Sequence, residues 1–155
     1  MNTSIVAKLE ERLMSAGVVY ERTEHAPVFT SAEAAAIRGT SLTSGAKALV
    51  CKADDAFVMF VLPADRRLAS AAVRRRLGVK SLRFANAEEI TRLTGLSPGA
   101  IPPFGSLFGL ATHCDERLAE NPRINFNAGD HTVSIAMSYQ DFLKVEQPVI
   151  GSYAE

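Results

Sequence analysis

The chain has 155 residues, 47% of them hydrophobic and 22% charged, and its 17 basic and 17 acidic side chains balance. This composition predicts one globular domain over residues 1–155 and argues against disordered, collagen-like or low-complexity structure. No apolar run approaches the roughly 20 residues that a membrane-spanning helix needs, and the charged N-terminus is not typical of a signal peptide, so we expect a cytoplasmic protein without membrane association.

Capping residues and hydrophobic periods predict alternating helices and strands in the first two thirds of the chain. Asn2, Thr3 and Ser4 are candidate N-caps of a first helix whose stop signal is Gly17. The further predicted elements are a strand at 18–23, a helix at 32–38, strands at 46–53 and 56–62, a helix at 68–77, a strand at 79–84 and a helix at 87–94. The strand at 56–62 is apolar on both faces, so we expect it in the middle of a sheet.

The amino-acid composition changes after residue 94. Residues 95–109 hold four of the ten glycines and three of the seven prolines, which indicates a loop. Strand candidates follow around 107–112, 124–127 and 132–137, and Ser138 caps a last helix at 139–144. The whole pattern predicts a single α+β domain in which helices flank a mixed, strongly curved β-sheet.

Several common catalytic and metal-binding patterns are missing from the sequence. No serine lies in a GxSxG motif, and no GK[ST] phosphate-binding loop is present. His25, His113 and His131 are far apart, and without HxH, HExxH or CxxC spacing we expect neither a metal site nor another cofactor. The roles of His25 and His131 stay open. Cys51 and Cys114 are interpreted as reduced packing residues.

Lys47 is the first candidate for a catalytic residue. It stands at the start of the strand 46–53, on the same side as Leu49, Cys51 and Ala53. A lysine on an apolar strand face must extend its ammonium to solvent, pair with an acid or bind a ligand. An ammonium in such a place can bind a phosphate or polarise a carbonyl, and we weigh this about equally with plain solvent exposure.

The second candidate is the glycine- and proline-rich segment Gly95–Gly105. Gly99 and Gly105 permit close backbone approach or a positive φ, and Pro102 and Pro103 stiffen the chain between them. A rigid loop with exposed amide groups suits a small polar ligand. A plain connecting loop is the commoner meaning of such a cluster.

Charge is unevenly spread along the chain. Residues 66–92 carry eight basic and two acidic side chains, a net charge of +6 that the rest of the chain balances. Such a run is most often a solvated helix face, but it also suits an anionic partner such as a nucleic-acid backbone. Arg74, Arg75 and Arg76 form its densest part and are candidate phosphate contacts.

Seven short segments follow one another at a characteristic spacing: Glu24-His25-Ala26-Pro27-Val28-Phe29-Thr30, Gly45-Ala46-Lys47-Ala48-Leu49-Val50, Val61-Leu62-Pro63-Ala64-Asp65-Arg66-Arg67-Leu68, Leu93-Thr94-Gly95, Gly99-Ala100-Ile101-Pro102-Pro103-Phe104-Gly105, Phe126-Asn127-Ala128-Gly129 and Ser134-Ile135-Ala136-Met137-Ser138-Tyr139. In this order they resemble the YbaK/prolyl-tRNA synthetase-associated (INS-like) family of aminoacyl-tRNA editing domains. The resemblance covers about residues 19–149, and it rests on the whole set because each segment is short.

The resemblance implies a partly barrel-like sheet and a free-standing trans-editing deacylase. Such enzymes hydrolyse the ester that joins a wrong amino acid to the 3′-terminal adenosine of a tRNA, here a tRNA(Pro)-type substrate before others. The family's key lysine falls on Lys47, and its substrate-binding positions fall on Gly99, Ile101, Pro103, Phe104, Gly105 and Gly129. The partner implied is the mischarged tRNA, with an aminoacyl-tRNA synthetase as a second partner, and the oligomeric state is left open.

Two positions depart from the patterns of known branches of that family. Ala48 stands where free-standing editors of alanyl-tRNA(Pro) often have Asn, and Ala100-Ile101-Pro102-Pro103 follows Gly99 where the YbaK branch often shows Gly-Gly-x-Ser-Pro. The amino acid that is removed is therefore not identified by the resemblance.

Two other functions fit the same sequence. A non-catalytic module would keep the fold and the tRNA contacts, whereas a small-ligand-binding or signalling protein would reuse the pocket without needing the basic segment 66–92. The presence of Lys47 favours the deacylase.

Overall fold

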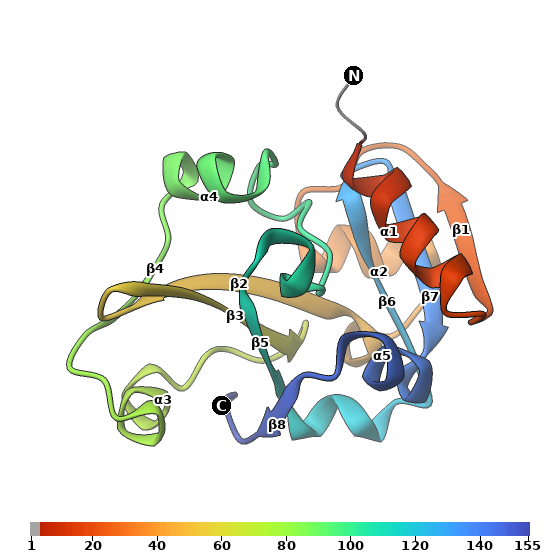
Figure 1. Cartoon of the computed structure of the whole chain (residues 1–155). Coiled ribbons are helices and arrows are strands. Elements are labelled where there is room, and N and C mark those ends of the chain that lie inside the picture. Colours follow the sequence, from red (N-terminus) through yellow and green to blue (C-terminus); the bar gives the residue numbers. More distant parts are fainter. Residues whose placement is uncertain (1–3) are drawn as a thin grey trace.

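The computed structural model describes residues 4–155, which form two β-sheets with helices around them (Figure 1). No helix in this part of the chain is both long and apolar enough to cross a membrane. The helices and strands are α1 (Ile5–Ser15), β1 (Tyr20–Glu24), α2 (Ser31–Arg38), β2 (Ala46–Ala53), β3 (Ala56–Pro63), α3 (Ser70–Leu77), β4 (Leu82–Phe84), α4 (Ala87–Thr94), β5 (Ala111–Asp115), β6 (Arg123–Asp130), β7 (Val133–Ser138), α5 (Tyr139–Glu146) and β8 (Val149–Gly151). Short 3-10 helices lie at Leu42–Ser44, Gly105–Phe108 and Glu116–Glu120.

The larger sheet is mixed and has the strand order β4-β2-β3-β5-β8. Its β3–β5 and β5–β8 pairs are parallel, and its other pairs are antiparallel. β3 is the middle strand, as predicted from its two apolar faces. The smaller sheet, β1-β7-β6, is antiparallel throughout. A single bridge between Gly45 and Asn125 joins the start of β2 to β6 and so connects the two sheets.

The smaller sheet separates helix α1 from helix α2. Side chains alternate between the two faces of a strand, so Ile124 and Phe126 of β6 face the core, where they cluster with Leu9 of α1. Asn125 and Asn127 face the other way, toward the Arg38 side chain of α2. In Figure 1, α1 lies in front of β6 and β7 and α2 lies behind them.

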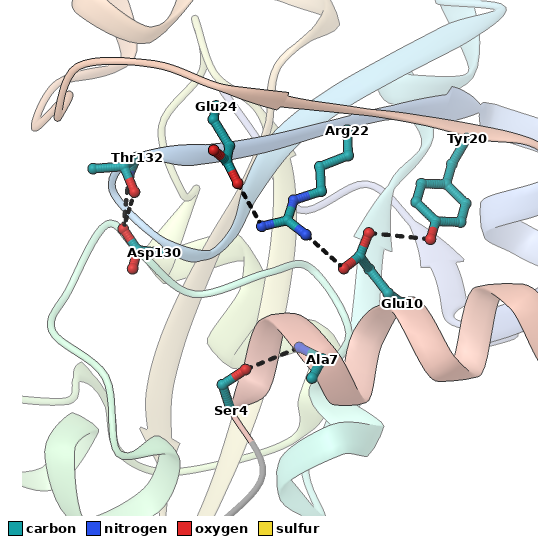
Figure 2. Close-up of polar contacts among 8 residues, drawn as sticks. All are labelled: Ser4, Ala7, Glu10, Tyr20, Arg22, Glu24, Asp130 and Thr132. Atoms are coloured by element: carbon teal, nitrogen blue, oxygen red, sulfur yellow. Dashed lines mark hydrogen bonds and ion pairs between the residues drawn. The ribbon is translucent and has the colours of Figure 1, made fainter.

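Helix α1 begins where a side chain satisfies a free backbone N–H group. The Ser4 hydroxyl accepts a hydrogen bond from the Ala7 N–H at 3.1 Å (Figure 2). Asn2 and Thr3, the other two predicted caps, lie outside the described residues. Ser4 is therefore the N-cap of α1, a position that serine commonly takes.

Polar contacts tie α1 to the edge strand β1. Glu10 accepts hydrogen bonds from Tyr20 and Arg22 at 3.1 Å each, and Arg22 also donates to Glu24 at 2.9 Å (Figure 2). Exposed ion pairs of this kind contribute only about 0–1 kcal/mol each to stability. The helix is held mainly by its buried leucines, Leu9 and Leu13, which are fully excluded from solvent.

Two clusters of buried side chains form the core. The larger cluster lies between the two sheets, α1 and α5, and at its centre the Phe104 ring packs against Phe126 and Phe142 with ring centroids 5.6 and 5.3 Å apart. The smaller cluster lies between the larger sheet and α3 and includes Phe60 and Tyr153. Each large apolar side chain buried in this way contributes roughly 1.5–3 kcal/mol.

The structure differs from the predicted elements in the middle of the chain. Residues 107–112 were expected as a strand, but a 3-10 helix occupies Gly105–Phe108 and the strand begins at Ala111. The tight turn forms because the Leu110 N–H bonds to the Gly105 carbonyl at 3.0 Å. The helix expected at 68–77 begins only at Ser70, since Leu68 forms a β-bridge with Ala154. The short strand β8 was not predicted.

Candidate functional site

A cavity of about 360 Å³ lies where the two sheets meet, along the start of β2. Two cationic side chains, Arg38 and Lys47, are among the residues that line it, and none of those residues is acidic. Its other polar lining side chains are Thr30, Ser31, Ser41, Asn125 and Asn127. The cavity lining therefore carries a net positive charge, which suits an anion or a group on which negative charge develops.

Lys47 is half-buried and lines this cavity. It also borders a second, smaller hollow of about 280 Å³, which it shares with Arg67 and Ser70. Burial lowers the pKa of the Lys47 ammonium from its ordinary 10.5, and the charge of Asp65 opposes part of that shift. A partly desolvated ammonium interacts more strongly with an incoming anion than a fully hydrated one does.

The edge of β2 beside Lys47 is not covered by another strand. β3 pairs with the whole of β2, whereas β4 pairs only with Cys51–Ala53. The Val50 carbonyl faces away from β3, because it accepts the Ala85 N–H at 2.9 Å. Main-chain groups two residues apart on a strand face the same side, so those of Ala48 face the cavity, which Ala48 lines. A backbone donor thus lies next to the lysine.

The loop that was predicted to bind substrate divides into two parts. Gly99 and Ile101 line the cavity, and Gly99 has a φ of 90°, which glycine adopts without strain. Pro103, Phe104 and Gly105 are buried and lie outside the cavity lining. The structure therefore brings only the first part of the loop together with Lys47.

The second part of the loop is an anchor. The Gly105 N–H donates to the Thr112 hydroxyl at 3.0 Å, and that hydroxyl donates to the buried carboxylate of Glu146 at 2.6 Å. A Cβ atom at Gly105 would lie 2.4 Å from Thr112 Oγ1, so no side chain fits there. Phe104 is fully buried in the core.

Gly129 also lies away from the cavity. It has a φ of 104°, and a Cβ atom there would lie 2.8 Å from Cγ2 of Ile5 in α1. Its place in the structure is explained by the close approach of α1 to the end of β6.

The two histidines whose roles were open both hold loops in place. His131 lies between the carbonyl of Val28, 2.9 Å from Nδ1, and the hydroxyl of Ser97, 2.9 Å from Nε2. His25 bonds through Nε2 to the Ser134 hydroxyl at 2.7 Å. Neither serine is among the residues that line the cavity, so these Ser–His contacts place no nucleophile in it.

Arg38 was not expected in the site from the sequence. Its guanidinium donates to Ser134 Oγ at 2.7 Å, Asn125 Oδ1 at 2.9 Å and Asn127 Oδ1 at 2.7 Å. All three acceptors are uncharged, and burial lowers the pKa of Arg38 from 12.5 to about 10. A basic residue in the last turn of a helix is ordinarily explained by the helix dipole, and polar residues that alternate along a strand ordinarily face solvent. The sequence therefore carries no clear signal for this cluster.

The basic residues of segment 66–92 have different surroundings. Arg74, Arg75 and Arg76 are exposed at the end of α3 and line neither hollow, and the Arg76 guanidinium lies 5.3 Å from the centre of the Tyr153 ring. Arg83 is bound by both carboxylate oxygens of Glu89, at 2.8 and 2.9 Å. Arg67 is the basic residue that shares a hollow with Lys47.

Neither metal ligands nor reactive thiols are found in the described structure. Within residues 4–155, no three His, Cys, Asp or Glu side chains are grouped so that they could hold a metal ion. Cys51 and Cys114 are free thiols with no exposed surface, and burial raises the pKa of each to about 12. Such thiols are unreactive and fill space in the core.

Comparisons with known proteins show the family to which this chain belongs. The sequence profile of the aminoacyl-tRNA editing domain family matches residues 25–145. The chain is 35% identical over 122 residues to the multifunctional Ser/Thr-tRNA deacylase ProXp-y of Escherichia coli K12, covering 76% of this chain and 73% of that protein. It is 23% identical over 148 residues to the prolyl-tRNA editing protein ProX of Acetoanaerobium sticklandii, covering 92% and 88% of the two chains.

The fold is also shared with solved structures. The crystal structure of a candidate trans-editing enzyme for prolyl tRNA synthetase superimposes with a TM-score of 0.87 over 100% of this chain and 99% of that one, at 23% identity. The α+β fold and the family resemblance predicted from the sequence are thereby confirmed. The chain belongs to the aminoacyl-tRNA editing domain family.

Proposed function

We propose that this chain is a trans-editing deacylase that hydrolyses the ester bond between a wrongly attached amino acid and the 3′-terminal adenosine of a tRNA. The observation that carries this proposal is a cavity with two cations, no acid and an uncovered strand edge, in a chain of the editing family. Its volume of about 360 Å³ lies within the range of about 300–1,000 Å³ that is usual for ligand pockets.

The chemistry follows from the reactivity of an aminoacyl ester. Such an ester needs positioning and charge stabilisation more than a strong nucleophile. Water adds to the ester carbonyl, negative charge develops on the carbonyl oxygen, and the bond to the ribose oxygen breaks as that oxygen takes a proton from the water. In this proposal the Lys47 ammonium stabilises the developing charge or anchors the terminal phosphate, and the Ala48 N–H is a second donor. The products are a free amino acid and an uncharged tRNA.

Small hydroxyl amino acids on tRNA(Pro)-type substrates are the first to test. The E. coli relative is named a Ser/Thr-tRNA deacylase, and the A. sticklandii relative is named a prolyl-tRNA editing protein. The hydroxyl side chains of Thr30, Ser31 and Ser41 in the cavity can bond to a substrate hydroxyl. A site that bonds a hydroxyl discriminates strongly against the analogue that lacks it.

The tRNA contacts are proposed in two places. Arg67 shares the smaller hollow with Lys47 and Glu155, and we propose it as a contact for a phosphate next to the terminal adenosine. Arg74, Arg75 and Arg76 are exposed on α3 and remain candidates for the acceptor stem. Replacing these three with Gln should weaken tRNA binding and flatten its dependence on salt. An unchanged salt slope would exclude them.

We further propose that residues 1–155 act as one editing domain in the cytoplasm, where charged tRNA is used. An aminoacyl-tRNA synthetase is the second proposed partner, since the structural neighbour is described as acting for prolyl tRNA synthetase.

The test is deacylation of a panel of mischarged tRNAs, including Ala-, Cys-, Ser- and Thr-charged species, by the wild type and by Lys47→Ala. We expect rapid loss of one or more species with the wild type and little with the variant. If the protein binds tRNA but hydrolyses none of the species, the result would support a non-catalytic tRNA-binding module. If it neither hydrolyses nor binds tRNA, the result would support a small-ligand-binding protein.

A further inference from the structure

The Arg38 guanidinium determines which way two amide side chains lie. A guanidinium can only donate hydrogen bonds, so the atoms of Asn125 and Asn127 that face it must be their carbonyl oxygens, at 2.9 and 2.7 Å. The amide nitrogens then point to other acceptors. Asn125 donates to the Ser44 hydroxyl at 2.9 Å, and Asn127 donates to the carbonyl oxygen of Gly99.

Asn127 is therefore the link between Arg38 and the loop that lines the cavity. Gly99 is exposed and has a φ of 90°, and a Cβ atom there would meet only the edge of the His131 ring, at 3.5 Å. Packing around Gly99 is thus sparse. The hydrogen bond from Asn127 fixes the carbonyl of this residue, and with it the start of the segment that carries Ile101 into the cavity wall.

A second chain of hydrogen bonds fixes Arg38 itself. His25 Nδ1 lies 2.8 Å from the Ala26 carbonyl, which can only accept, so Nδ1 donates, and Nε2 lies 2.7 Å from the Ser134 hydroxyl oxygen. The same oxygen accepts the Arg38 Nε–H, also at 2.7 Å. Ser134 is 3% exposed, so this support is rigid.

We propose that Arg38 is a positioning residue for the deacylation reaction, which holds Asn127, and through it the Gly99 end of the Gly99–Gly105 segment, in the geometry that receives the aminoacyl ester. This inference rests on the proposed function. Lysine cannot replace arginine in this role, because a single ammonium does not present the planar fork that reaches three acceptors on two strands.

The primary test is a double-mutant cycle with Arg38→Lys and Asn127→Ala, measured by single-turnover deacylation of the best tRNA substrate of the wild type. Arg38→Lys keeps the charge and removes the fork. We expect each single variant to lower the rate about a hundredfold, the loss that a misplacement of about 1 Å can cause, with little change in KM. The double variant should be no slower than Asn127→Ala alone, since both changes break one chain of contacts. Additive losses, or a fully active Arg38→Lys, would overturn the inference.

A second measurement does not depend on activity. Hydrogen exchange of the segment 96–105 should be faster in Arg38→Lys and in Asn127→Ala than in the wild type, while exchange of β3 stays unchanged. If Arg38→Lys does not fold, Asn127→Ala alone carries both readouts, because that side chain is only partly buried. Unchanged exchange and rate in Asn127→Ala would contradict the proposal.

The matched control is Arg22→Gln, which removes an exposed arginine that bonds to two carboxylates and is not part of the cavity lining. It should leave both the rate and the exchange of 96–105 at wild-type values. If the wild type hydrolyses no mischarged tRNA, the proposed function fails. If it does and Asn127→Ala matches it in both readouts, only the role of Arg38 fails.

Discussion

The two faces of the β1-β7-β6 sheet each hold an arginine, but the partners of the two guanidinium groups differ. On the face that carries α1, Arg22 is 40% exposed and lies between the carboxylates of Glu10 and Glu24 (Figure 2). On the face that carries α2, Arg38 is partly buried and bonds only to a hydroxyl and two amides. The first arrangement pairs the positive charge with acids, whereas the second surrounds it with uncharged acceptors.

The difference shows how the cavity is kept receptive to an anion. A buried cation is costly unless its hydrogen bonds are satisfied, and the amides of Asn125 and Asn127 satisfy them without cancelling the charge. An acid in the same place would bind Arg38 more strongly and remove the positive potential. The buried acids Asp115 and Glu146 lie outside the cavity lining, where they hold backbone groups and loops together.

The largest expected effect is a difference in deacylation rate between variants of the two lysines of β2. Lys47→Ala should lower the deacylation rate by about 10²–10³, the usual effect of removing one donor that stabilises a developing oxyanion. Lys52→Ala is the matched control, because Lys52 is on the same strand but lies 5.8 Å from the Phe57 ring centre and outside the cavity lining. Rapid-quench kinetics on the best substrate gives both rates. Equal rates for the two variants would mean that Lys47 contributes no more to deacylation than a lysine outside the cavity lining.

A structural acid should affect stability and leave catalysis intact. Asp115 accepts the N–H groups of Arg117, Tyr153 and Ala154 at 2.9, 2.8 and 2.7 Å and is fully buried. Asp115→Asn should lower the free energy of unfolding by about 3 kcal/mol, because an amide turns a donor toward these N–H groups. Urea denaturation measures the loss. A stable variant with a slower deacylation rate would contradict the assignment of Asp115 to structure.

The pH dependence of stability should show the desolvation of Lys47. Its pKa in the folded protein lies below 10.5, so between that lower value and 10.5 the unfolded chain binds more protons than the folded one. The stability of the wild type relative to Lys47→Met should therefore rise with pH through this interval. The deacylation rate, corrected for spontaneous ester hydrolysis, should fall over the same interval as the ammonium is lost. Urea titrations from pH 8 to about 11 measure the first effect, and a flat difference would show that Lys47 is fully hydrated.

The smallest expected effect is on the outer face. Arg22→Gln should lower the free energy of unfolding by less than about 1 kcal/mol, and the difference should shrink further in high salt. Thermal unfolding at low and high ionic strength measures it. A loss of several kcal/mol that is insensitive to salt would mean that the Arg22 contacts are not simple surface pairs.

The elements that follow simple local rules were predictable from the sequence. Strands 46–53 and 56–62 and the helix 87–94 match the structure to within one residue, because turn residues, apolar runs and caps determine them locally. The family resemblance and Lys47 in the cavity wall also followed from short motifs. The extended strand predicted at 107–112 was wrong, since the Gly105 turn is supported by Thr112 and, through its hydroxyl, by Glu146, which is distant in sequence.

Arg38 and its two asparagines show why the rest of the site was not predictable. Each of these residues has an ordinary local explanation, as a helix C-terminal cation or a solvent-facing strand residue. Only the packing of α2 against β6 brings them together around one guanidinium. Period-two patterns tell which residues share a face, but they do not tell what covers that face.

The alternation along β6 gives one strand two tasks. Ile124 and Ala128 face the core, while Asn125 and Asn127 face the cavity and Arg38 from positions between them. A substitution at either asparagine therefore changes the cavity lining and also removes an acceptor of the Arg38 guanidinium. Ligand preference and folding stability are thus coupled through a single strand, and a change that improves one acts on the other.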